Sequence, residues 1–109
     1  MQTPLRISFH GTTPTDAITT YVGARAAKLE RFHDRLIGCH VVIEKPHRHK
    51  THGDDHRVRV DLVIPGQELV VSRGGGGRKG GEDLYASIDA VFEAAQRVLA
   101  EHTRARRAS

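Results

Sequence analysis

Alternation of apolar and polar residues predicts four strands in this chain, because successive side chains of a half-buried strand point to opposite faces. The predicted strands cover residues 5–10, 39–44, 57–64 and 68–72. The third is the clearest, since its valine, leucine and isoleucine residues fall mainly on one face while Arg57, Arg59 and Asp61 fall on the other. The turn signal Pro65-Gly66 then predicts that the third and fourth strands form a hairpin.

Two longer segments show the helical period instead. The first helix is predicted over residues 14–32, where the apolar stripe consists of Ile18, Val22, Ala26 and Leu29. The second is predicted from about residue 82 to about residue 104, where the stripe consists of Leu84, Ile88, Val91, Phe92, Ala95, Val98 and Leu99. We expect Thr13 to cap the first helix, with Pro14 in its first turn and Asp16 near its positive dipole end. The basic residues 103–109 are expected to fray as a tail.

The order of these elements predicts the fold class. A strand, a helix, three strands and a second helix, each with one apolar face, form an α+β two-layer sandwich of β-α-β-β-β-α order. Both helices are then expected on one face of a four-stranded sheet, with the first two strands parallel. The length of 109 residues predicts a single domain over residues 1–109, with flexible loops at about 46–56 and 73–81.

The charge balance of the chain favours a polyanionic partner. Lysine and arginine number 17 against 13 aspartates and glutamates, which gives a formal net charge of +4. A basic surface attracts phosphate polyanions, although a generic basic protein would have the same composition. No apolar run reaches the length of a membrane span, and the N-terminal residues lack the pattern of a signal peptide, so a cytoplasmic protein is expected.

Basic residues recur along one flank of the first predicted helix. Arg25, Lys28 and Arg31 follow one another at intervals that place them close together, and Arg35 continues the row beyond the helix end. Such a row can bind phosphates along a helix edge. The alternative is an ordinary solvated face, because acidic residues lie close by in the sequence.

A glycine-rich segment over residues 74–81 contains Arg78 and Lys79. It does not match the phosphate-binding loop of nucleotide hydrolases, because Gly80 follows Lys79 where that motif requires serine or threonine. A linker, a basic loop that contacts RNA and a nucleotide site remain the three interpretations.

Four histidines crowd the predicted loop before the third strand, namely His47, His49, His52 and His56. Imidazoles of this kind could hold zinc or nickel, and they are weak candidates for a metal site. The alternatives are a solvated polar loop or further RNA contacts. No metal or other cofactor is predicted.

Catalytic arrangements are sparse in this sequence. Cys39 falls within a strand pattern and is interpreted as a small core residue, and no serine has an evident base and orienting partner. The chain is therefore predicted not to be an enzyme. Tyrosine and phenylalanine number only 2 and 3, and tryptophan is absent, which favours recognition of folded RNA by shape and phosphate over base stacking.

Two motifs carry a resemblance to a known family. One is Tyr21-Val22 with Lys28-Leu29-Glu30 and Asp34-Arg35, and the other is Asp83-Leu84-Tyr85-Ala86-Ser87-Ile88-Asp89. At this separation, with three strands between them, the sequence resembles the short form of the ribosome hibernation-promoting factor or ribosome-associated inhibitor family, also called subunit-interface or sigma-54 modulation proteins. The resemblance implies the β-α-β-β-β-α fold already expected from the pattern.

The resemblance also implies a function. Such proteins bind 16S rRNA of the small ribosomal subunit near the decoding centre, in isolated subunits and in 70S ribosomes. They exclude mRNA and tRNA under stress or in stationary phase. By position, Arg25, Lys28 and Arg97 match basic residues of the family, whereas Ala94 and Glu101 stand where relatives carry further positive charge.

The full set of expected rRNA-binding residues is Arg25, Lys28, Arg31, Arg35, Arg78, Lys79, Arg97, Arg104, Arg106 and Arg107. No membrane or small-molecule partner is expected, and nothing in the pattern demands self-association. The alternatives are a stress-related regulator that binds another RNA or a protein, and a metal-binding protein that uses the histidine-rich loop.

Overall fold

The structure is a computed structural model that describes residues 1–45, 56–74 and 84–108. Its elements follow the predicted order of strand, helix, three strands and helix. They are β1 (Arg6–His10), α1 (Asp16–Phe32), β2 (Gly38–Glu44), β3 (Arg57–Ile64), β4 (Gln67–Gly74) and α2 (Leu84–Ala108).

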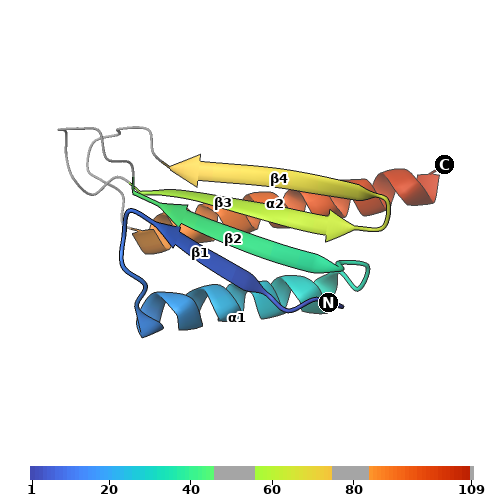
Figure 1. The fold of residues 1–109 in the computed structure, drawn as a ribbon. Helices are drawn as coiled ribbons and strands as arrows, with labels where there is room; N and C mark the ends of the chain where they lie inside the picture. The colour runs from blue at the N-terminus through green and yellow to red at the C-terminus, as the bar shows by residue number, and fades with distance from the viewer. Residues whose placement is uncertain (46–55, 75–83, 109) are drawn as a thin grey trace.

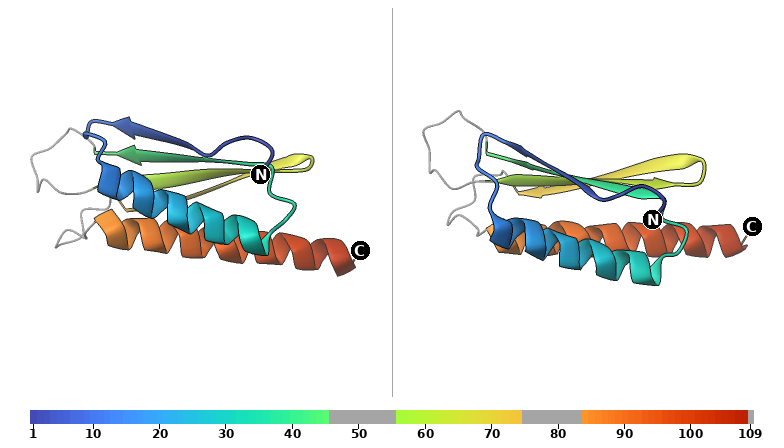
Figure 2. Two further views of the ribbon diagram at one scale, coloured as in Figure 1. Left: turned by 90° about the horizontal axis from the view of Figure 1, so that it is seen from below. Right: turned by 60° about the horizontal axis from the view of Figure 1, so that its bottom comes forward.

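The strands form one sheet in the order β1-β2-β3-β4. β1 pairs with β2 in parallel, and the two other pairings are antiparallel. Both helices cover the same face of the sheet, as Figure 1 and the two views of Figure 2 show. The predicted α+β sandwich with a four-stranded sheet is therefore confirmed.

The core lies between the sheet and the two helices. The alternating pattern of β3 directs its four inward side chains into this layer, and all of them are buried. They pack against the stripes of α1 and α2, whose buried members include Val22, Ile88 and Phe92. Removing each such side chain from water contributes about 1.5–3 kcal/mol, so these stripes fix which helix faces turn inward and which stay outside.

The first helix begins two residues later than the sequence pattern predicted. Thr15, not Thr13, is the N-cap, with extended backbone angles and a side-chain oxygen that accepts a hydrogen bond from the Ile18 amide at 3.2 Å. This spacing of three residues is the geometry that a capping hydroxyl needs. Pro14 therefore precedes the cap, while Asp16 lies in the first turn as expected.

The expectation of a fraying basic tail is wrong within the described residues. α2 continues to Ala108, so Arg104, Arg106 and Arg107 are helical. This segment contains no glycine or proline, and alanine and arginine favour the helix. Positive side chains in the last turn also offset the negative end of the helix dipole.

The second predicted loop begins later than expected, because β4 extends to Gly74. Gly74 has φ +91°, and a Cβ atom there would lie 2.4 Å from the carbonyl oxygen of His56. Only glycine fits this close approach of two backbones. The rest of both predicted loops, residues 46–55 and 75–83, lies outside the described residues.

Candidate nucleic-acid interface

A groove runs between α1 and α2 on the side of the helices away from the sheet. The two helices lie next to each other along their length (Figure 2). The groove has a volume of about 530 Å³. It is lined by Arg25, Lys28, Leu29, Phe32, Phe92, Glu93, Gln96 and Arg97. Three of these side chains are cationic and one is acidic, so the groove has an excess of positive charge.

Arg25 is held in the wall of this groove by the opposite helix. Its Nη2 atom donates a hydrogen bond to the backbone oxygen of Asp89 at 3.3 Å, and its Nε atom lies 3.6 Å from Asp89 Oδ1. The guanidinium also lies 5.9 Å from the centre of the Phe92 ring, within the range of a cation–π contact. Arg25 is half-buried as a result, and it links α1 to α2.

Asp89 also holds a second residue of α1. The hydroxyl of Tyr21 donates to Asp89 Oδ1 at 2.6 Å, and the Tyr21 ring meets the Tyr85 ring edge-on at 4.8 Å between centroids. Asp89 belongs to the second family motif, but the motif does not show which residues it binds. Its partners are far away along the chain, so no local spacing could have indicated the contact.

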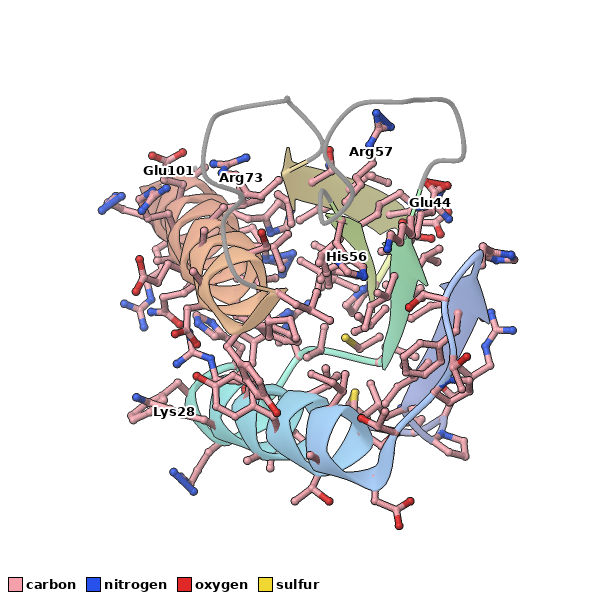
Figure 3. All side chains as sticks on the ribbon, turned by 90° about the vertical axis from the view of Figure 1, so that its left-hand side faces the viewer. Lys28, Glu44, His56, Arg57, Arg73 and Glu101 are labelled. Atoms are coloured by element: carbon pink, nitrogen blue, oxygen red, sulfur yellow. The ribbon has the colours of Figure 1, made fainter. Side chains whose placement is uncertain are left out.

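Lys28 and Arg97 differ from Arg25, because both are exposed. Figure 3 shows Lys28 directed away from the sheet, on the outer side of the helix pair. Within the part of the chain that the structure describes, neither side chain forms a hydrogen bond or an ion pair. Both charges are therefore available to phosphate, which is the property that a row of RNA-binding residues requires.

α2 continues past the end of α1 (Figure 2). Residues from this end of both helices line a second concavity. Its volume is about 550 Å³, and its lining includes Arg35, Arg106 and Arg107 from the expected set. Phe32 lines both this concavity and the groove. The sequence pattern placed Phe32 near the apolar stripe of α1, but 63% of this residue is exposed.

Two further described members of the expected set, Arg31 and Arg104, do not line either hollow. Arg31 is exposed, and its guanidinium lies 5.8 Å from the centre of the Phe32 ring. Arg104 is exposed on α2. Arg78 and Lys79 lie outside the described residues.

Three of the four histidines proposed as weak metal ligands lie outside the described residues. They are His47, His49 and His52, whereas the fourth, His56, is half-buried just before β3. Residues 1–45, 56–74 and 84–108 contain no group of three or more histidine, cysteine, aspartate or glutamate side chains that could hold a metal ion.

Cys39 is a core residue, as predicted. It is buried in β2. Burial, together with a smaller effect of the Asp61 carboxylate, raises the pKa of its thiol to about 12. Because the thiolate is the nucleophilic form, a thiol of this pKa is unreactive near neutral pH.

The open face of the sheet carries arginines too, and two of them, Arg59 and Arg6, bind neighbouring side chains. Arg59 donates two hydrogen bonds to Asp61, at 3.0 and 3.2 Å. Arg6 Nη2 lies 3.3 Å from His40 Nδ1, and Ser8 Oγ lies 2.8 Å from His40 Nε2. Since a guanidinium can only donate, Nδ1 accepts from Arg6, and Nε2 then carries the hydrogen that it donates to Ser8. This network is suited to a neutral imidazole, while Arg57 on the same face is exposed without a partner among the described residues.

The same network predicts a dependence of stability on pH. Burial lowers the pKa of His40 below its ordinary value, and the charge of Arg6 lowers it further, against the opposing effect of Asp61. As pH falls through about 6.5, the unfolded chain gains a proton before the folded one, so the free energy of unfolding should fall. Above this pH both states are neutral at this residue, and His40 contributes no pH dependence.

This prediction can be measured by urea unfolding at about pH 7.5 and at about pH 5.5. The parent should lose more stability on acidification than the variant His40→Gln, because all other histidines are common to both proteins. Equal losses in the two proteins would show that His40 does not sense pH.

Sequence comparisons relate the chain to proteins of the ribosome. The family model described as sigma 54 modulation protein / S30EA ribosomal protein matches residues 5–107. A ribosome hibernation promoting factor of Escherichia coli (strain K12) is 31% identical over 98 residues, which cover 90% of this chain and 90% of that protein. One from Azotobacter vinelandii is 29% identical over 100 residues, covering 90% of this chain and 80% of that protein.

Two solved structures share the fold. A ribosomal subunit interface protein from Coxiella burnetii superposes with a TM-score of 0.73 at 11% identity, covering 92% of this chain and 97% of that one. The N-terminal domain of Thermus thermophilus Protein Y gives a TM-score of 0.66 at 23% identity, covering 89% of this chain and 96% of that one. Among the described residues, no helix is both long and apolar enough to cross a membrane.

Proposed function

Because this chain belongs to the sigma 54 modulation protein / S30EA ribosomal protein family, we propose that it is a ribosome-associated hibernation factor of the cytoplasm. It binds 16S rRNA of the small subunit near the decoding centre, in free subunits and in 70S ribosomes. There it occupies space that mRNA and tRNA require, so that translation stops. It acts by binding and exclusion, as a single domain over residues 1–109, without a cofactor or a catalytic step.

The observation that carries this proposal is a pair of exposed cations, Lys28 and Arg97, that line one groove between the helices. Lys28 and Arg97 are both exposed on the helix side and form no hydrogen bond or ion pair among the described residues. On the sheet side, Arg59 and Arg6 are already bound to neighbours. Free cations attract phosphate more strongly than paired ones, so the helix side is the surface that should meet RNA.

Shape supports the same surface. The groove between the helices is a shallow channel with cations on both of its walls, Lys28 on α1 and Arg97 on α2. Structured RNA is recognised largely through its shape and its phosphates, and a channel of this kind can follow a phosphate backbone. Ala94 stands where the family resemblance implies a positive charge, but it is buried, so α2 offers no side chain for RNA at this position.

Co-sedimentation with purified 30S, 50S and 70S particles tests this function. The protein should pellet with 30S and 70S particles and stay in the supernatant with 50S particles. Its affinity should fall at least about tenfold between roughly 50 and 200 mM salt, because each phosphate contact releases counterions. Binding that ignores salt would contradict phosphate-led recognition. Binding to free RNA as tight as to 30S particles would favour a general RNA-binding regulator instead.

A further inference from the structure

We propose that the second concavity, at the C-terminal end of α1, holds one unpaired nucleotide within a strand of RNA. The base stacks on the ring of Phe32, and the adjoining phosphate binds Arg35 and Arg107. This inference rests on the proposed function, because it adds a base-binding position to the same RNA surface.

The exposure of Phe32 is the first observation that points to a base. Phe32 is the last residue of α1, and 63% of its surface is open to water. The other phenylalanines are half-buried or buried. Proteins that bind single-stranded RNA stack bases on exposed aromatic rings, since every base has a flat π-face that such a ring can cover.

The hollow beside Phe32 has the size and the lining of a ligand site. Its volume of about 550 Å³ lies within the range of small-molecule pockets. Leu36, Pro65 and Leu99 supply apolar walls. Two hydrogen bonds join the elements around the hollow. His33 Nε2 lies 2.8 Å from Gln96 Oε1, and His102 Nε2 lies 3.1 Å from Gln67 Oε1. A base placed here would meet a fixed apolar surface.

The charged side chains that line the hollow favour an anionic ligand. Arg35, Arg106 and Arg107 line the hollow, against a single acidic side chain, Asp34. Within the described ranges 1–45, 56–74 and 84–108, Arg35 and Arg107 form no hydrogen bond or ion pair. Guanidinium groups match phosphate in a bidentate geometry, so an apolar floor with an arginine rim fits a nucleotide better than a neutral ligand.

Continuity with the groove favours a nucleotide within RNA over a free one. Phe32 lines both hollows, so a strand that follows Lys28 and Arg97 along the groove arrives directly at the second hollow. Successive phosphates of the strand would bind first the cations of the groove and then Arg35 and Arg107. One base between these phosphates would point into the second hollow.

The test uses the full isotope-labelled chain, an adenylate hexamer and adenosine monophosphate. The hexamer should shift the NMR amide signals of pocket residues such as Leu36, Ala100 and Thr103. In fluorescence anisotropy, Phe32→Leu should lower the affinity for a labelled hexamer about tenfold, while Phe32→Tyr, which keeps the ring, should stay close to the parent. Arg107→Gln should weaken binding by about fivefold, and the matched control Arg57→Gln, at an exposed arginine of β3 outside the hollow, by less.

Three results would overturn the inference: pocket signals that do not shift, an unchanged affinity of a folded Phe32→Leu variant, or adenosine monophosphate binding as tightly as the hexamer. The last would make the hollow a site for free nucleotides. Co-sedimentation of the same variants with 30S particles separates this inference from the proposed function. If the parent protein fails to bind 30S particles, the proposed function is wrong. Binding of the hexamer would still test whether the hollow holds a nucleotide.

Discussion

Replacing Lys28 and Arg97 together by glutamate should lower the affinity for 30S particles by about 100-fold at roughly 100 mM salt, with little change in thermal stability. Both side chains are exposed on the helix side and have no partner among the described residues, so folding does not depend on them. Each substitution removes a phosphate contact and sets a negative charge against the RNA. The slope of binding against salt concentration should also become shallower by about one unit for each lost contact.

A matched control distinguishes this surface from the effect of net charge. Arg57→Glu with Arg73→Glu makes the same change in charge on β3 and β4, and Figure 3 shows both residues at the strand ends, away from Lys28. The control should bind within about threefold of the parent, since only weak long-range attraction is lost. An equal loss of affinity in both double variants would mean that the groove is not the RNA surface.

Arg25→Glu should destabilise the fold by about 2–3 kcal/mol and lower the melting temperature by about 10–20 °C. The substitution removes the hydrogen bond to the Asp89 backbone and the contact with the Phe92 ring. It also places a second carboxylate beside Asp89. Because Asp89 is 41% exposed, water screens part of this repulsion, and the larger share of the effect comes from the lost bonds.

The double variant Arg25→Glu with Asp89→Arg is the control for this second prediction. It restores an opposite pair across the helices and should recover part of the lost melting temperature, as a double-mutant cycle measures. An Arg25→Glu variant that melts at the same temperature as the parent would show that the contacts of Arg25 with α2 do not stabilise the fold. Reversal of Arg25 is therefore a poor test of RNA binding, since lost binding would follow from lost folding.

The sequence by itself determined the elements and their inward faces. Period two along β3 and the helical period of α2 are local properties, and each residue that they directed inward on β3 is buried. The two family motifs, one in each helical segment, predicted the ribosome as the partner. Helix ends were predicted less well. Thr13 and Thr15 both suit a cap, and only the backbone angles of the folded chain distinguish them.

Only the tertiary structure decided which basic residues are free. Arg25 lies about two helical turns after the buried Ile18, and this spacing could have indicated an inward position. It could not have named Asp89 as the partner, because the two residues are 64 positions apart in the chain. Phe32 shows the opposite case, since its period places it near the apolar stripe, yet 63% of the residue is exposed. A period assigns a residue to one side of a helix, and the neighbouring element decides whether that side is covered.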